Sequence, residues 1–281
     1  MTVHGFVDVC LRRLSPLYPD PEVKAIAFRL LEHYTDIPSY KYIAEPELAL
    51  PDSDQEAAVL AALDDLATGR PLQYVLGFTE FCGHRFKVGD GSLIPRPETE
   101  ELVSRIIDEL SGTEISDEPF NILDICTGSG CIAWSLAAAF PEAMVYGCDL
   151  SDAALRYACK QRVKVHGAKP IFFSADVLAA PPAGLPKFDV IVSNPPYICE
   201  SERAAMRPNV LGFEPAEALF VPDDDPLRFY DAIAAWAGAL LRPGGRVYLE
   251  INERFGSEVA AVFPGSQVAR DLSGRDRFVI R

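Results

Sequence analysis

The chain has 281 residues and a formal net charge of −15, and no basic run or stripe is visible, which argues against tight binding to a phosphate backbone. Hydrophobic residues make up 49% of the chain, yet no apolar run is long enough to span a bilayer, and the N-terminus does not resemble a signal peptide. The seven cysteines form no CxxC pair and do not cluster with the histidines, so we expect free thiols in a cytoplasmic protein and no metal site.

Residues 1–71 are predicted to form a small all-α domain. The motif Asp-Pro-Glu at 20–22 is typical of a helix start, because proline suits the first turn and acidic side chains favour a helix N-terminus. Ser53 and Glu56 have the spacing of a capping box. Gly69 is typical of the end of the helix that this box begins.

Residues 72–95 are predicted to form a β-hairpin linker, because aromatic residues, short alternation and Gly-rich turns follow one another there. A helix is expected to begin in the stretch Arg-Pro-Glu-Thr-Glu at 96–100 and to end at residue 110. The polar stretch 111–119 is predicted to be a loop.

From Phe120 onward, predicted strands and helices alternate. The expected strands lie at 121–126, 144–149, 170–176, 188–193, 245–251, 267–272 and 277–281, and the expected helices at 131–140, 152–165, 226–241 and 254–263. Such alternation predicts an α/β fold, with a doubly wound, mostly parallel seven-stranded sheet covered by helices on both faces. A ligand is expected beyond the carboxyl ends of the strands.

The stretch Asp-Ile-Cys-Thr-Gly-Ser-Gly at 124–130 lies between the first predicted strand of this sheet and its helix. Glycine permits positive φ and a close approach of ligand to backbone. Gly128, Gly130 and Ala133 fit the pattern G-x-G-x-x-A, and Asp149 ends the next strand, where an acid would bind a ribose diol. The loop therefore predicts an adenosine-containing ligand, either a dinucleotide or S-adenosylmethionine.

The predicted strand 188–193 is followed by Asn194-Pro195-Pro196-Tyr197, a stiff loop that cannot continue a ladder of hydrogen bonds. Such a loop suits a methyltransferase that acts on a planar nitrogen. The side-chain oxygen of Asn194 can accept one N–H of the substrate and the carbonyl of Pro195 the other, and both contacts strengthen as positive charge grows on nitrogen. The ring of Tyr197 can pack against the planar group. We therefore expect Asn194, Pro195 and Tyr197 to be catalytic and Pro196 to bind substrate with them.

Several motifs in chain order resemble those of the peptide chain release factor N5-glutamine methyltransferases. Beside the two loops above, they are Arg70-Pro71-Leu72-Gln73-Tyr74, the block Ile-Pro-Arg-Pro-Glu-Thr-Glu at 94–100, Phe213-Glu214-Pro215 and Arg242-Pro243-Gly244-Gly245. The resemblance implies a helical N-terminal domain over 1–71 that recognises a release factor, a linker over 72–95 and a class I methyltransferase domain over 96–281. It implies S-adenosylmethionine as cofactor and, as substrate, the glutamine in the Gly-Gly-Gln loop of class 1 release factors, with no nucleic-acid or membrane partner.

The resemblance also assigns cofactor-binding residues by position. They are Cys126, Thr127, Gly128, Ser129, Gly130, Asp149, Asp176, Val177 and Asn194. Cys126 stands where the family usually has glycine, so we expect altered cofactor affinity rather than lost activity.

Three other functions are compatible with parts of the sequence. An N6-adenine nucleic-acid methyltransferase would share the Asn-Pro-Pro-Tyr loop, but the net charge of −15 is against it. A nicotinamide-dependent oxidoreductase would use the glycine pattern but leaves that loop unexplained. A non-catalytic binding protein would have no need of Asn194 and Asp149.

Overall fold

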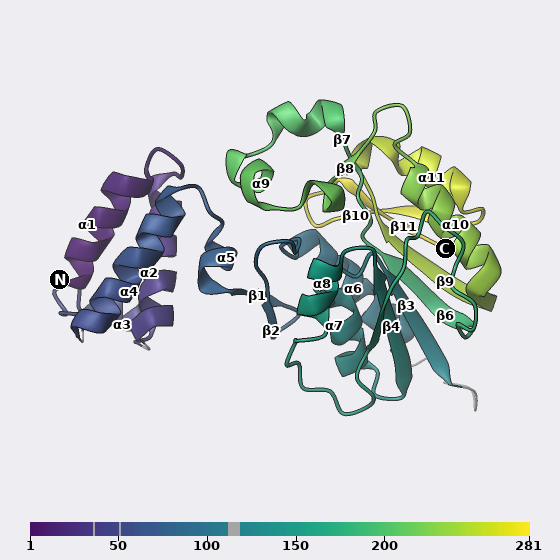
Figure 1. The fold of residues 1–281 in the computed structure, drawn as a ribbon, viewed down its shortest axis with the longest axis horizontal. Coiled ribbons are helices and arrows are strands. Elements are labelled where there is room, and N and C mark those ends of the chain that lie inside the picture. The colour runs from purple at the N-terminus through teal and green to yellow at the C-terminus, as the bar shows by residue number, and fades with distance from the viewer. Residues whose placement is uncertain (36, 51, 112–118) are drawn as a thin grey trace. The chain divides into compact units, whose positions relative to one another are not determined.

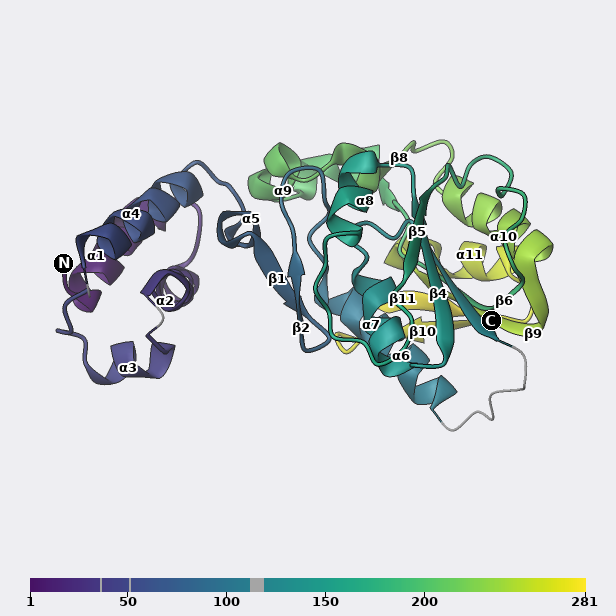
Figure 2. The same ribbon diagram turned by 60° about the horizontal axis from the view of Figure 1, so that its bottom comes forward.

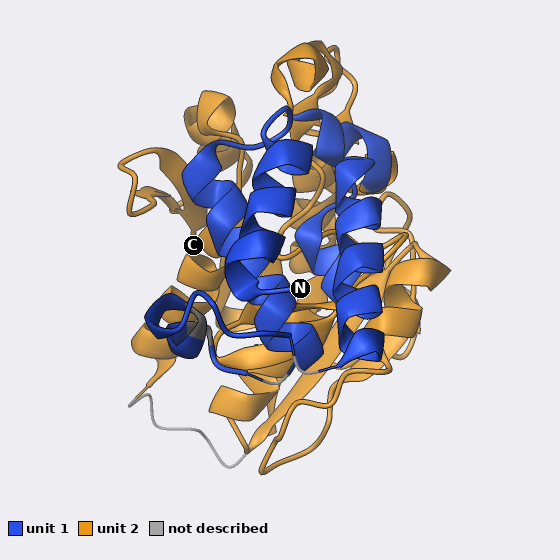
Figure 3. Ribbon diagram, turned by 90° about the vertical axis from the view of Figure 1, so that its left-hand side faces the viewer, with its two compact units in different colours: residues 1–77, 207–213 blue, residues 78–206, 214–281 orange. Residues whose placement is uncertain are grey.

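The structure, a computed structural model, describes residues 1–35, 37–50, 52–111 and 119–281 (Figure 1). It divides into two compact units, coloured separately in Figure 3. Unit 1 comprises residues 1–77 and 207–213, and unit 2 comprises residues 78–206 and 214–281. No helix of the described residues is long and apolar enough to cross a membrane. All seven cysteines are free thiols.

Unit 1 is helical, as predicted. Its helices are α1 (Val3–Leu14), α2 (Asp20–Thr35), α3 (Ser39–Ala44), α4 (Ser53–Ala67), α5 (Leu72–Leu76) and, from far along the chain, α9 (Pro208–Phe213). The expected cap of α4 was one residue wrong, because the carboxylate of Asp52, and not Ser53, accepts the first free N–H groups, those of Asp54 and Gln55. Gly69 ends this region with φ of +92°, as expected for a residue that closes a helix.

The predicted hairpin is shorter than expected. It consists of β1 (Phe78–Phe81) and β2 (His84–Lys87), which pair antiparallel. The prediction of a hairpin was wrong for residues 72–76, which form α5, because Pro71 begins this helix and Gly77, with φ of +76°, ends it. The turn of the hairpin places Cys82 and Gly83 at positive φ, the backbone conformation that two-residue hairpin turns require.

Unit 2 contains the predicted seven-stranded sheet, in the order β10-β11-β9-β6-β3-β4-β5. The strands are β3 (Phe120–Ile125), β4 (Ala143–Asp149), β5 (Ile171–Ser174), β6 (Phe188–Ser193), β9 (Leu241–Glu250), β10 (Gln267–Arg270) and β11 (Asp276–Ile280). The first five of these run parallel, β11 pairs antiparallel with β9, and the edge strand β10 pairs antiparallel with β11. The doubly wound, mostly parallel architecture is therefore confirmed.

Helices cover both faces of the sheet (Figures 1 and 2). They are α6 (Pro97–Leu110), α7 (Cys131–Ala139), α8 (Asp152–Ala158), α10 (Arg228–Leu240) and α11 (Gly256–Val262). Alternate residues of each strand face opposite sides, so that Ile122 packs in one core with α6 and α7, whereas Leu123 packs in a second core with α10 and α11. Near-continuous apolar strands such as β6 are expected of a sheet covered on both faces.

One predicted helix was too long, and several short elements after β6 were not predicted. The helix expected over 152–165 ends at Ala158, because Gln161 beyond it turns its carboxamide to the backbone of Lys87 and Ser129. No local pattern in the sequence predicts the short elements between β6 and α10. These are β7 (Ile198–Cys199), a 3-10 helix at Glu200–Ala205, α9, a 3-10 helix at Ala216–Ala218 and β8 (Phe220–Val221), and a further 3-10 helix at Glu253–Phe255 precedes α11. Of the loop predicted at 111–119, residues 112–118 lie outside the described residues.

Candidate active site

The carboxyl ends of three neighbouring strands meet at one edge of the sheet. Ile125 of β3 pairs with Cys148 of β4 on one side and with Ser193 of β6 on the other. The hydroxyl of Ser193 donates to the carbonyl of Ile125 at 2.6 Å, which ties the two strand ends together. The glycine loop and Asn194 directly follow the ends of β3 and β6, and Asp149 is the last residue of β4, so the fold brings these three features together.

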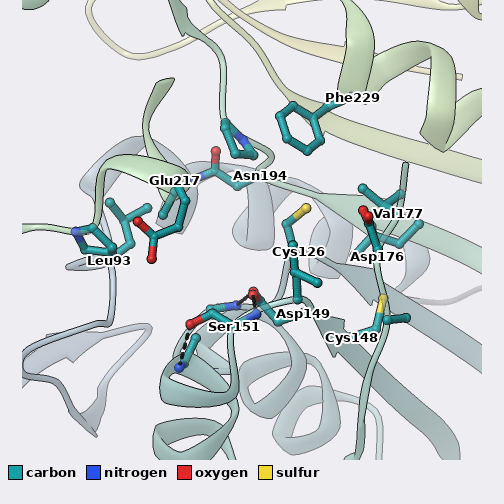
Figure 4. Close-up of a pocket in the computed structure, with 18 of the residues that line it drawn as sticks. Leu93, Cys126, Cys148, Asp149, Ser151, Asp176, Val177, Asn194, Glu217 and Phe229 are labelled. Atoms are coloured by element: carbon teal, nitrogen blue, oxygen red, sulfur yellow. Dashed lines mark hydrogen bonds between the residues drawn. The ribbon is translucent and has the colours of Figure 1, made fainter. Parts of the chain in front are cut away.

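A cavity of about 380 Å³ lies at this edge (Figure 4). Seven of the predicted site residues line it: Cys126, Gly128, Asp149, Asp176, Val177, Asn194 and Pro196. Its lining also contains a third carboxylate, that of Glu217, whereas no lysine or arginine occurs among the described residues that line it. The cavity is therefore suited to a ligand that carries positive charge.

Asp149, the last residue of β4, connects this strand to the glycine loop through its side chain. Its carboxylate accepts the backbone N–H of Gly128 at 2.8 Å and that of Ser151 at 2.9 Å (Figure 4). Burial raises the pKa of Asp149, and these two N–H groups oppose the shift. Because each carboxylate oxygen accepts more than one hydrogen bond, both remain able to accept from a ligand in the cavity.

Three of the predicted cofactor residues, Thr127, Ser129 and Gly130, do not line the cavity. The hydroxyl of Thr127 donates to buried Asp124 at 2.5 Å, and the carbonyl of Ser129 accepts from Gln161 at 3.0 Å. These contacts stabilise the conformation of the glycine loop on the side that does not line the cavity. Burial raises the pKa of Asp124 to about 7, and its Oδ1 atom has no hydrogen-bond partner among the described residues.

Cys126 occupies an unusual backbone position in the cavity wall. Its φ of +59° is in the left-handed region, which costs a residue with a Cβ about 1–2 kcal/mol relative to the right-handed conformation. Its sulfur points into the cavity (Figure 4). Burial raises the pKa of its thiol well above the usual range, so the thiol stays protonated and is not poised as a nucleophile.

The far end of the cavity is largely apolar. Val177 is buried there, and its neighbour Asp176 accepts the N–H of Leu178 at 2.9 Å. Leu150, Leu178 and Phe229 line the cavity, although Leu150 is 67% exposed. These three residues were not predicted from the sequence. An apolar residue directly after the acid at the end of β4 was a signal for Leu150, since such a loop position is usually polar.

The Asn-Pro-Pro-Tyr loop is held from the side away from the cavity. Asn194 and Pro196 line the cavity, and the side-chain nitrogen of Asn194 donates to Thr99 at 3.0 Å. Pro195 is buried and does not line it. Tyr197 does not line it either, because its hydroxyl donates to Glu250 at 2.9 Å.

Two other motifs from distant parts of the sequence meet beside the cavity. Glu214 is buried, and its carboxylate accepts the N–H of Ile94 at 3.0 Å and an N–H of Arg96 at 2.6 Å. Their neighbours Leu93 and Pro215 line the cavity. Nothing in the sequence predicts that these two motifs pair, because Arg96 and Glu214 are 118 positions apart in the chain.

The chain is similar to known proteins over nearly its whole length. Two family models match it, the PrmC N-terminal domain over residues 11–77 and the Methyltransferase small domain over residues 107–209. It is 39% identical over 271 residues to the release factor glutamine methyltransferase of Bacteroides thetaiotaomicron, with 95% of each chain covered. It is 36% identical to that of Flavobacterium psychrophilum, with 99% of this chain and 98% of the relative covered. The similarity thus extends over both units.

Proposed function

Since the chain belongs to the release factor glutamine methyltransferases, we propose that it methylates N5 of the glutamine in the Gly-Gly-Gln loop of a class 1 release factor. One observation carries the proposal. Asn194, which follows β6, borders the same cavity as Cys126, which follows β3, and Asp149, which ends β4 (Figure 4). A group that orients an amide therefore lies next to a site for an adenosine-containing cofactor.

The cavity fits S-adenosylmethionine better than a dinucleotide. S-adenosylmethionine carries a sulfonium and an ammonium group, whereas a dinucleotide carries an anionic pyrophosphate. The three carboxylates in the lining, with no lysine or arginine among its described residues, favour the cation. Asp149 would bind the ribose hydroxyls, the backbone from Cys126 to Gly128 the methionine part, and Asp176 and Val177 the adenine end.

When bound, S-adenosylmethionine supplies an electrophilic methyl group. The residues of the chain must orient a poor nucleophile toward it, because the lone pair of an amide nitrogen is delocalised. The side-chain oxygen of Asn194, which lines the cavity, accepts one N–H of the glutamine amide. We assign the other N–H to the carbonyl of Pro195, which does not itself line the cavity but lies between Asn194 and Pro196, which do. Both acceptors become more favourable as positive charge develops on the nitrogen, and the rigid loop holds them before the reaction begins. The nitrogen can lose its proton to water after transfer, so no general base is required.

The charge of the chain favours a protein partner over a nucleic acid. With 26 basic and 41 acidic residues, the chain lacks the positive charge that a phosphate backbone requires. We assign recognition of the release factor to the helices of residues 1–71. These residues contain no catalytic constellation that would give them another role.

The test is methyl transfer to a purified class 1 release factor, followed by mass spectrometry of its peptides. One added methyl group on the glutamine of the Gly-Gly-Gln loop is the expected result. A factor in which that glutamine is alanine is the matched control, and it should remain unmodified. Methylation of the control, or transfer to duplex DNA and not to the factor, would contradict the proposed substrate.

A further inference from the structure

A chain of buried hydrogen bonds extends from Asn194 away from the cavity. The side-chain nitrogen of Asn194 donates to Oγ1 of Thr99 at 3.0 Å, and the hydroxyl of Thr99 donates to Oε2 of Glu250 at 2.7 Å. The hydroxyl of Tyr197 donates to Oε1 of the same carboxylate at 2.9 Å. Thr99 is 2% exposed and Glu250 is 1% exposed, so water does not compete for these contacts.

The directions of these hydrogen bonds follow from the number of protons available. A carboxylate can only accept, and Glu250 therefore takes the single hydroxyl proton of Thr99 and that of Tyr197. Having given its proton away, Thr99 can only accept from Asn194. The carboxamide of Asn194 must consequently turn its NH₂ group toward Thr99, which leaves its oxygen on the other side.

Burial raises the pKa of Glu250, and the hydroxyl donors Thr99 and Tyr197 and the charge of Arg277 oppose this shift. The two donated hydroxyl protons fit the carboxylate as an acceptor on both of its oxygens. Arg277 is itself held by the carbonyl of Ile251 at 3.1 Å, next to Glu250 in the chain. The carboxylate of Glu250 thus has two hydroxyl donors and a favourable interaction with the charge of Arg277.

We propose that Thr99 and Glu250 are positioning residues, which fix the carboxamide of Asn194 so that its oxygen, and not its NH₂ group, meets the amide of the substrate. The inference rests on the proposed function. A carboxamide turned by 180° would present a donor to the N–H of the glutamine, and two donors repel. Because oxygen and nitrogen differ little in size, packing alone cannot distinguish the two orientations. The hydrogen bonds of Thr99 and Glu250 do distinguish them, because Thr99 has no proton left to donate to Asn194.

The motif at 94–100 thereby has a role in supporting the Asn-Pro-Pro-Tyr loop. Thr99 lies in the block 94–100 and is 95 residues from Asn194, and Glu250 lies at the end of β9. Thr99 is in the first turn of α6, which Pro97 begins. This helix therefore contributes a side chain to the support of the loop that follows β6.

Thr99→Val is the main test, because it keeps the shape of the side chain and removes the hydroxyl. We expect kcat for methyl transfer to the release factor to fall about 10²-fold, the scale of a misplaced catalytic group. KM for the factor and the affinity for S-adenosylmethionine should be unchanged. Thr99→Ser should restore kcat, since it restores the hydroxyl. Thr79→Val, at another buried threonine in β1, is the matched control and should leave kcat unchanged.

The same Thr99 substitution made in an Asn194→Asp enzyme distinguishes a positioning role from a general loss of structure. In Asn194→Asp both side-chain oxygens are acceptors, so orientation no longer matters and Thr99→Val should cost far less than it does in the wild type. An equal loss of kcat in both backgrounds, or full kcat in Thr99→Val alone, would overturn the proposal. A wild-type enzyme that bound S-adenosylmethionine but left the release factor unmodified would instead overturn the proposed function.

Discussion

The two loops that border the cavity are held in place in different ways. The glycine loop is held mainly by the end of the neighbouring strand β4. The backbone N–H of Thr127 donates to the carbonyl of Cys148 at 2.9 Å, and the backbone N–H of Gly128 donates to the carboxylate of Asp149. The Asn-Pro-Pro-Tyr loop depends on side chains from distant elements, those of Thr99 and Glu250. Most hydrogen bonds that hold the glycine loop therefore come from two adjacent strands, whereas those that hold the Asn-Pro-Pro-Tyr loop come from elements far apart in the chain.

The largest effect is expected at the substrate loop. Asn194→Ala removes the acceptor for one N–H of the glutamine amide, and loss of one preorganised polar contact of this kind costs about 10²–10³ in kcat. Binding of S-adenosylmethionine, measured by calorimetry, should change much less. Asn194→Asp keeps an acceptor and should retain part of the activity. Wild-type turnover by Asn194→Ala would contradict the role of this residue.

A smaller effect, and one on cofactor binding, is expected at the glycine loop. Asp149→Ala removes the proposed partner of the ribose hydroxyls and leaves the N–H groups of Gly128 and Ser151 without their acceptor. The affinity for S-adenosylmethionine should fall by roughly 1.5–3 kcal/mol, the scale of a hydrogen bond to a charged group. Calorimetry measures it directly, and an unchanged affinity would remove Asp149 from the cofactor site.

The contribution of Asp124, which accepts from the glycine loop, should be visible in how the free energy of unfolding depends on pH. Burial raises the pKa of this carboxyl from 3.8 to about 7, so between these values the folded protein holds a proton that the unfolded chain has lost. The free energy of unfolding should therefore fall, as pH rises from about 4 to about 7, by at most about 1.4 kcal/mol per pH unit relative to Asp124→Asn.

Urea unfolding of both proteins over this pH range gives the difference between them. Subtraction removes the contributions of the other titrating groups, which the two proteins share. Parallel curves would show that Asp124 titrates in the folded protein as it does in the unfolded chain.

The smallest effect is expected from Cys126→Gly. Glycine adopts the φ of +59° without strain, while it costs more entropy on folding, so the free energy of unfolding should rise by no more than about 1 kcal/mol. Cys82→Gly is the matched control, because Cys82, with φ of +47°, lies in the hairpin turn. Only Cys126→Gly should alter the affinity for S-adenosylmethionine. An equal change in both variants would mean that the Cys126 side chain does not influence the cofactor site.

Local patterns in the sequence were sufficient to predict most of the fold. Apolar runs bounded by turn residues located the seven strands, and their alternation with helices implied a parallel sheet. Errors arose where tertiary contacts overrode local preference. The helix expected to reach residue 165 ends at Ala158, since Gln161 bonds to the backbone of Lys87, 74 residues away.

The sequence by itself determined which groups could take part in the chemistry, because a glycine loop, an acid at the end of the next strand and an Asn-Pro-Pro-Tyr loop are each local patterns. It also implied that they converge, since parallel strands end at one edge of a sheet. The partners that orient these groups were decided only by the tertiary structure. Glu250 approaches Thr99 and Tyr197 across 151 and 53 residues of chain, and a buried hydrogen bond of that span leaves no periodicity in a single sequence.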